Sequence, residues 1–130
     1  MPLFSERRAL QTIIAISAIV PLAAGAAGML QGMNMLADGA LNLGLDSHMR
    51  YLSGLLFGVG LCFLSCIPRI ETKTARFQLL TLIVFIGGLA RLGGALLFGW
   101  PPAGMTFGLG MELIVTPLLC LWQRRVARAS

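Results

Sequence analysis

Two ionisable residues stand inside long apolar segments of this sequence. Arg91 lies in the run Phe77–Phe98, and Glu112 lies in the run Gly104–Gln123. If these runs cross a membrane, each charge costs at least about 2.5–3.5 kcal/mol to insert, so such charges are normally paired or functional. Each residue is about eight positions from the same side of the membrane, which is roughly 12 Å along a helix. Equal depth on two consecutive, antiparallel helices predicts that Arg91 and Glu112 pair.

A second polar group surrounds the start of the run Tyr51–Ile67. We expect it to join the first pair in one cluster that opens to the outer face, and the expected ligand-binding residues are Arg50, Arg91, Glu112, His48, Tyr51, Asp46 and Asn34. Two arginines with one acid at the centre suit a carboxylate, a phosphate or a lipid head group, because a guanidinium binds such anions through two parallel hydrogen bonds. The alternative is structural: Arg91 and Glu112 only hold two helices together, and Arg50 extends to the membrane surface.

Other chemistries have weaker support. Three cysteines at similar depth could form a redox or soft-metal site, but buried cysteine usually acts as a small apolar residue; they are Cys62, Cys66 and Cys120. Methionines near His48 could bind copper(I), yet methionine at helical spacing usually serves packing. We therefore predict no metal site, and the sequence identifies no cofactor. The chain has neither a second carboxylate near Glu112 nor a nucleophile–base pair, which weighs against an enzyme.

The composition explains why these charges are unusual. The chain of 130 residues is 57% hydrophobic and 12% charged, whereas soluble domains are nearer ~45–50% apolar and ~25% charged. Its mean hydropathy is +0.84. A small soluble domain cannot bury so much apolar surface, so part of its solvent must be lipid. We predict an all-α integral membrane four-helix bundle, one domain over residues 1–130, with spans at about 9–30, 51–67, 77–98 and 104–123.

The distribution of basic residues predicts the orientation. Eight of the ten lie before the first span, between the second and third, or after the fourth. Lysine and arginine collect on the cytoplasmic side, so we expect both termini to be cytoplasmic. The net charge of +5 is divided among these segments and forms no continuous stripe, so we expect no nucleic-acid partner.

The first span has an alternative interpretation. Arg7 and Arg8, an apolar stretch and the small residues Ala23–Gly28 resemble a secretory signal with its cleavage site. The apolar run continues to Leu30, which is longer than a normal signal core, so we expect the span to be retained.

Small residues and helix-breaking residues suggest how the spans pack. Pairs at four-residue spacing predict close helix contacts, within one chain or between copies in a homo-oligomer; they are Gly28 and Gly32, Gly54 and Gly58, Ala90 and Gly94, and Gly104 and Gly108. Asp46 or Ser47 could cap the second helix. Pro117 lies inside the fourth span and should kink it. The outer connection, residues 31–48, mixes polar residues with leucines and predicts a folded lid or a short interfacial helix.

The chain resembles the domain-of-unknown-function 4345 family of small four-span bacterial proteins over nearly its whole length. The segments that carry the resemblance are LDSHMRYLSG (Leu45–Gly54), SCIPRIE (Ser65–Glu71), GGLARL (Gly87–Leu92) and MELIVTPLLCLWQ (Met111–Gln123). The resemblance implies a loose relation to DoxX-like membrane proteins, some of them associated with quinone-linked redox complexes. It implies no activity.

Three functions remain open at this point. The first is binding or transport of a small anionic or lipid-like ligand at the Arg/Glu cluster. The second is an accessory or assembly subunit of a larger membrane complex, possibly a redox complex, that docks through its glycine faces. The third is a small membrane enzyme that acts on a lipid or isoprenoid, with Glu112 as acid or base and Arg91 tuning it.

Overall fold

The computed structural model describes residues 2–35 and 40–130, and these residues are almost entirely helical. The helices are α1 (Pro2–Gln31), α2 (Leu43–Cys66), α3 (Thr74–Phe98), α4 (Ala103–Gly110) and α5 (Thr116–Arg128), with a π-helical turn η3 (Met111–Val115) between α4 and α5. Two short 3₁₀ helices, η1 (Gly32–Met35) and η2 (Ile70–Thr72), follow α1 and α2. No described residue lies in a strand. The prediction of an all-α chain is confirmed.

Four helical segments are long and apolar enough to cross a membrane. They are Ser5–Met35, Leu43–Cys66, Thr74–Phe98 and the combined α4–η3–α5 segment Ala103–Arg128. Large apolar side chains on them point outward: Ile19, Leu82 and Leu121 are 54–60% exposed. An apolar exterior suits lipid better than water. The chain therefore has four candidate membrane spans, as expected of a multi-pass membrane protein.

Prolines and caps set the ends of these helices. Pro68 follows the end of α2, and Pro101 and Pro102 separate α3 from α4. The start of α2 differs from the prediction, because the helix begins at Leu43 and the amide oxygen of Asn42 accepts the N–H of Leu45 at 3.0 Å. Asn42 is therefore the N-cap. The prediction that Asp46 or Ser47 caps this helix is wrong.

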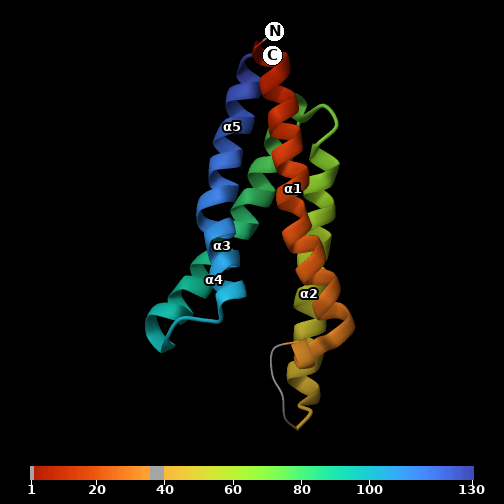
Figure 1. The fold of residues 1–130 in the computed structure, drawn as a ribbon, viewed down its shortest axis with the longest axis vertical. Coiled ribbons are helices and arrows are strands. Elements are labelled where there is room, and N and C mark those ends of the chain that lie inside the picture. The colour runs from red at the N-terminus through yellow and green to blue at the C-terminus, as the bar shows by residue number, and fades with distance from the viewer. Residues whose placement is uncertain (1, 36–39) are drawn as a thin grey trace. The chain divides into compact units, whose positions relative to one another are not determined.

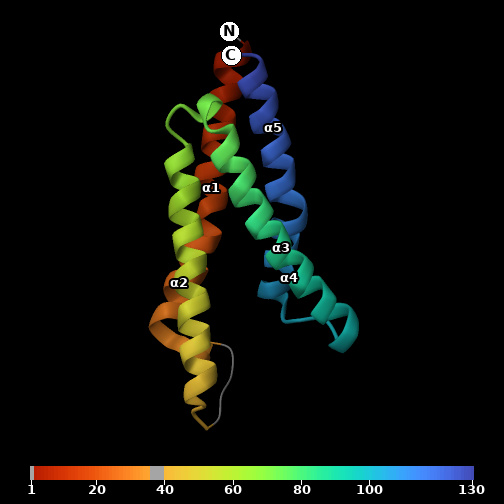
Figure 2. The same ribbon diagram turned by 180° about the vertical axis from the view of Figure 1, so that it is seen from behind.

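The described contacts divide the chain into two compact units, and the first comprises Met1–Ile13 with Cys66–Ser130. Figures 1 and 2 show α3 and α5 side by side in this unit from opposite directions. Apolar side chains fill the space between its helices, including the fully buried Phe77 and Val126. The start of α1 and the end of α5 lie together (Figure 1), where Trp122 Nε1 donates to Glu6 Oε1 at 3.0 Å.

The second unit, Ile14–Ser65, consists of most of α1 packed against α2. Its helices approach closely at Gly25, where an added Cβ would lie 2.7 Å from the backbone nitrogen of Phe57. At Gly28 an added Cβ would overlap the side chain of Ser53. These two glycines let the backbones come together without a side chain between them, which is the usual basis of helix packing in lipid.

Candidate functional site

Arg91 and Glu112 face one another inside the first unit. Arg91 lies on α3 and Glu112 lies on η3, and Nη2 of Arg91 is 3.4 Å from Oε1 of Glu112. The other terminal nitrogen, Nη1, donates to the carbonyl oxygen of Met105 on α4 at 3.1 Å. The pairing predicted from equal depth is therefore found. Arg91 thus ties α3 to α4 and to the π-helical turn η3.

The turn that carries Glu112 is distorted by the residues that follow it. The backbone N–H of Thr116 and its hydroxyl both donate to the carbonyl of Met111, the hydroxyl at 2.7 Å. This i→i−5 pattern widens the helix. Pro117, one residue later, has no N–H to donate, so one carbonyl of this turn lacks its helical partner. Such π-helical turns are frequent at functional sites, and here the turn includes the acidic residue of the ion pair.

Two glycines make room for the ion pair. An added Cβ at Gly88 on α3 would lie 2.9 Å from Cβ of Glu112 and 2.8 Å from Cδ2 of Leu113. An added Cβ at Gly108 on α4 would lie 2.9 Å from Nη1 of Arg91. Gly88 therefore lets the π-helical turn pack directly on α3. Gly108 lets the guanidinium lie against the backbone of α4.

The pair leaves hydrogen-bonding capacity unused. Oε2 of Glu112 is buried and has no hydrogen-bond partner among the described residues. The Arg91 side chain is 37% exposed and the Glu112 side chain 19% exposed. A guanidinium carries five N–H donors, so Arg91 can bind an additional acceptor. The arrangement could hold an anion on Arg91 or a proton on Glu112.

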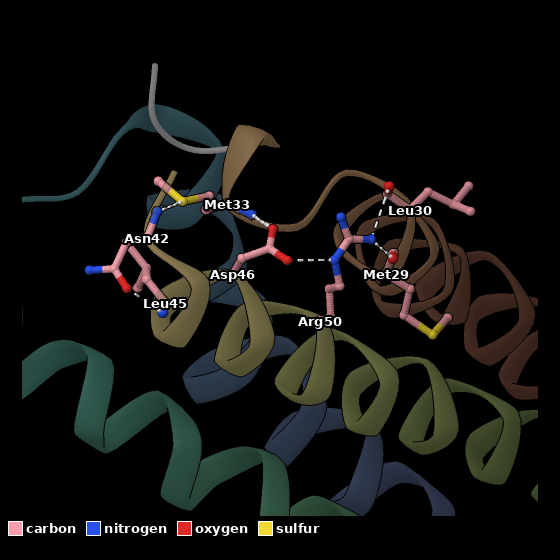
Figure 3. Close-up of polar contacts among 7 residues, drawn as sticks. All are labelled: Met29, Leu30, Met33, Asn42, Leu45, Asp46 and Arg50. Carbon is pink, nitrogen blue, oxygen red and sulfur yellow. Dashed lines mark hydrogen bonds and ion pairs between the residues drawn. The ribbon is translucent and has the colours of Figure 1, made fainter. Parts of the chain in front are cut away.

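Arg50 and Asp46 form a separate group in the second unit (Figure 3). Nε of Arg50 donates to Oδ2 of Asp46 at 2.8 Å, and Nη1 donates to the carbonyls of Met29 and Leu30 at 2.7 and 3.2 Å. These carbonyls belong to the last turns of α1, where a cation both satisfies unpaired acceptors and complements the helix dipole. Arg50 therefore caps α1 from the neighbouring helix.

Asp46 completes this capping group from the first turns of α2. Its Oδ1 accepts the backbone N–H of Met33 at 3.0 Å, immediately after Gly32, which has a φ of 58° (Figure 3). Glycine at a left-handed position just after a helix is a common helix end. An added Cβ on Gly32 would overlap the Asp46 carboxylate. The connection thus continues from α1 through η1 with its backbone held by α2.

The remaining predicted site residues also belong to the second unit, and all three are exposed. They are Asn34 in η1, and His48 and Tyr51 on α2. The structure thus joins the predicted residues as two pairs, Arg91 with Glu112 and Asp46 with Arg50, in different units. A single cluster of all seven stays a prediction. Part of the predicted outer connection, residues 36–39, lies outside the described residues.

Comparison with known proteins gives a family. Residues 9–123 match the family described as "Domain of unknown function (DUF4345)". The chain belongs to this family. No curated protein and no solved structure matches the chain. Membership therefore confirms the resemblance noted from the sequence and assigns no activity.

One buried polar group of this DUF4345 chain was not predicted from the sequence. Gln123 is fully buried, and its Nε2 donates to the carbonyl of Ile70 at 2.9 Å and to Oγ1 of Thr74 at 3.0 Å. Gln11 similarly donates to the carbonyl of Ile67 at 2.7 Å. These amides hold the turn between α2 and α3 against α1 and α5. The sequence signal for such a buried amide is a glutamine near the end of an apolar run, because a helix end in water more often carries a charged residue.

The same end of the first unit carries two ion pairs. Arg7 pairs with Glu71 at 3.2 Å, and Arg125 pairs with Glu6 at 3.2 Å. The start of α1, the turn after α2 and the end of α5 therefore meet at one end of the unit, and this end carries basic residues from all three segments. The side of the membrane that this end faces stays a prediction.

The three cysteines lie in different surroundings: Cys66 is buried, Cys62 is exposed and Cys120 is half-buried. Within residues 2–35 and 40–130, no three histidine, cysteine or acidic side chains are grouped so that they could hold a metal ion.

Proposed function

We propose that this chain is a multi-pass protein of the bacterial inner membrane that binds a small anionic or lipid-like ligand at Arg91 and Glu112. The observation that carries the proposal is the incomplete pairing of two charges within candidate spans. Oε2 of Glu112 is buried without a partner among the described residues, and Arg91 has spare donors and 37% exposure. The Arg7–Glu71 pair also leaves one buried carboxylate oxygen, Oε2 of Glu71, without a described partner. What sets Arg91 and Glu112 apart is that both charges lie inside candidate spans.

The energetics of buried ion pairs support a binding role. Replacing such a pair by apolar residues of similar size is often neutral or stabilising by about 1–4 kcal/mol. Leucines would therefore join α3 to η3 at least as well as Arg91 and Glu112. The chain nevertheless has two charges within apolar segments, beside two closely packed glycines and a π-helical turn. Ligand binding that uses the charges explains this arrangement better than helix packing does.

The position of the pair restricts the ligand. Arg91 is 98 − 91 = 7 residues from the end of α3, and Glu112 is 112 − 103 = 9 residues from the start of α4. At 1.5 Å per residue these are depths of about 10 and 13 Å along the helices. A strongly hydrated ion would lose its water at this depth. The fitting ligand has a carboxylate, phosphate or similar head group for Arg91 and an apolar body that remains in the lipid.

The proposal includes an orientation of the spans in the membrane. Both termini are cytoplasmic in this orientation, because the segments rich in arginine and lysine then lie inside. Within the first unit, Arg91 and Glu112 are then nearer the outer ends of α3 and α4. In the second unit His48, Tyr51 and Asn34 are exposed, and their part in ligand binding stays a prediction.

The test is native mass spectrometry of the full chain extracted in a mild neutral detergent, for the wild type, Arg91→Leu and Arg125→Leu. Arg125 is the matched control, because it also pairs with an acid but its side chain is 76% exposed. We expect a small molecule or lipid on the wild type and on Arg125→Leu, and none on Arg91→Leu. The same ligand complement on all three proteins would contradict the proposal.

One observation favours a second candidate, an accessory subunit of a larger membrane complex. Gly87 and Gly94 on α3 are exposed, and an added Cβ at either would have no described atom within 4 Å. Open glycines on a lipid-facing helix allow a partner helix to approach closely. This function predicts a protein partner at fixed stoichiometry that is lost in Gly94→Leu and kept in Arg91→Leu. Loss of the partner only in Arg91→Leu would argue against it.

A further inference from the structure

We propose that Glu112 competes with the ligand for Arg91, so that the site takes up an anion and a proton together. The inference rests on the proposed function and concerns its regulation. In the empty site the Glu112 carboxylate pairs with Arg91. When an anion binds Arg91, the carboxylate leaves the guanidinium and takes a proton from hydronium or from the acid form of the buffer, becoming a neutral carboxylic acid. One anion and one proton enter: the new O–H bond forms on Glu112 as the proton donor loses its bond to the same hydrogen and becomes its conjugate base.

Charge balance requires this exchange. Arg91 and Glu112 together are neutral, so an anion added to Arg91 would leave one net negative charge within an apolar segment. Charges at such depths cost several kcal/mol, and two negative groups that share one cation also repel each other strongly in a medium of low dielectric constant. A proton on Glu112 returns the site to neutrality. The site therefore favours binding the anion and the proton as a pair.

The geometry of the ion pair allows the exchange. The ion pair joins Oε1 of Glu112 to Nη2 of Arg91 at 3.4 Å, which is longer than the ~2.7–2.9 Å of a strong charge-assisted hydrogen bond. Arg91 keeps its separate hydrogen bond from Nη1 to the Met105 carbonyl, so it stays in place when the carboxylate leaves. Oε2 is buried and without a described partner, and this oxygen is the natural site for the added proton.

Arg91 is the charged group nearest to Glu112 in this unit. The elements packed against η3 are α3, α4 and α5. On α3 the only other charge is Arg76, which is 15 residues from Arg91, or about 22 Å along the helix. Helix α4 carries no charge, and the basic residues of α5 begin at Arg124, 12 residues after Glu112, or about 18 Å away. The ionisation of Glu112 in this unit therefore responds mainly to whether Arg91 is free or occupied.

The test uses the full chain in a neutral detergent with octanesulfonate as the probe. This amphiphilic anion does not titrate near neutral pH, so any proton taken up must go to the protein. Calorimetry in two buffers of different ionisation enthalpy gives the number of protons per bound anion. We expect close to one proton at about pH 8, with affinity falling about tenfold per pH unit while Glu112 is ionised in the empty protein. In Glu112→Gln, binding should persist with no proton uptake and no pH dependence.

The control is Glu6→Gln, because Glu6 is an acid paired with an arginine at the other end of the same unit. It should bind the probe with the same proton uptake as the wild type. Binding by the wild type without proton uptake, or unchanged uptake in Glu112→Gln, would overturn the inference and leave the proposed function standing. If neither the wild type nor Glu112→Gln binds octanesulfonate, the anion site itself is refuted and the proposed function fails.

Discussion

Two neighbouring glycines on α3 offer a test of how the site is built. At Gly88 an added Cβ would lie 2.8–2.9 Å from Leu113 Cδ2 and Glu112 Cβ, whereas at Gly87 it would have no described atom within 4 Å. Carbon atoms in contact normally lie about 3.5–4.0 Å apart, so Gly88→Ala must push η3 away from α3 by several tenths of an ångström or rotate Leu113.

The expected size of the effect follows from a comparison of the two variants. Replacing a helical glycine by alanine gains up to about 1 kcal/mol of helix propensity at either position. Overpacking a close contact costs about 1–3 kcal/mol, and only Gly88→Ala incurs this cost. Because the gain in helix propensity is the same in both variants, Gly88→Ala should be about 1–3 kcal/mol less stable than Gly87→Ala.

The assay is reversible unfolding in mixed micelles of increasing denaturing-detergent content, followed by the fluorescence of Trp100 and Trp122. Equal unfolding midpoints for Gly87→Ala and Gly88→Ala would refute the packing of the π-helical turn on α3. A large loss of stability in Gly87→Ala would refute the assignment of that glycine to an open face.

Three further variants test other contacts. Gln123→Leu removes the hydrogen bonds from Nε2 to the Ile70 carbonyl and to Oγ1 of Thr74, while the carbonyl keeps the backbone N–H of Lys73. Two lost bonds at about 0.5–1.5 kcal/mol each should destabilise the chain by about 1–3 kcal/mol in the same unfolding assay. Gly32→Ala places an L-residue at a φ of 58°, and its Cβ would overlap the Asp46 carboxylate. The variant should therefore lose at least about 1 kcal/mol of stability, and an unchanged unfolding midpoint would contradict this helix end. Gly108→Ala should change stability by less than about 1 kcal/mol, because the guanidinium it meets ends a flexible side chain. It should nevertheless reduce the bound ligand in native mass spectrometry, and full retention would show that the guanidinium position is unimportant.

The spans could be predicted because their signal is long and simple. Apolar runs of about 20 residues identify membrane helices, and the prolines after α2 and α3 indicate where those helices end. The start of α2 could not be located this way, since Leu43 and Leu45 are also compatible with an interfacial loop. The deciding contact is the side-chain amide of Asn42 on the N–H of Leu45, and Asp46 is used instead to hold η1.

The candidate site was predictable in part. Equal depth on antiparallel helices was enough to pair Arg91 with Glu112, because that argument needs only the helix rise and the order of the spans. The π-helical turn was not predicted, although Pro117 five residues after Glu112 signals a distorted turn. A proline at this place can produce either a kink or a wider π-helical turn. The Thr116 hydroxyl and the packing of η3 against Gly88 decide between the two.

Spacing alone was a weak guide to the glycine contacts. Of the predicted small-residue positions, Gly28 packs closely on α2, whereas an added Cβ at Gly58 or Gly104 would meet no described atom within 4 Å. Gly25 makes a close backbone contact and was not singled out. A four-residue repeat shows that small residues share a helix face, but only the position of the neighbouring helix decides which of them touch it.

The most direct test of the account is the double variant Arg91→Leu/Glu112→Leu, measured for unfolding stability and for bound ligand by native mass spectrometry. If the pair is a binding site, the double variant should fold as well as the wild type or better by about 1–4 kcal/mol, and it should carry no ligand. If the double variant keeps the wild-type ligand complement, or is markedly less stable, the pair only joins two helices and the central claim is wrong.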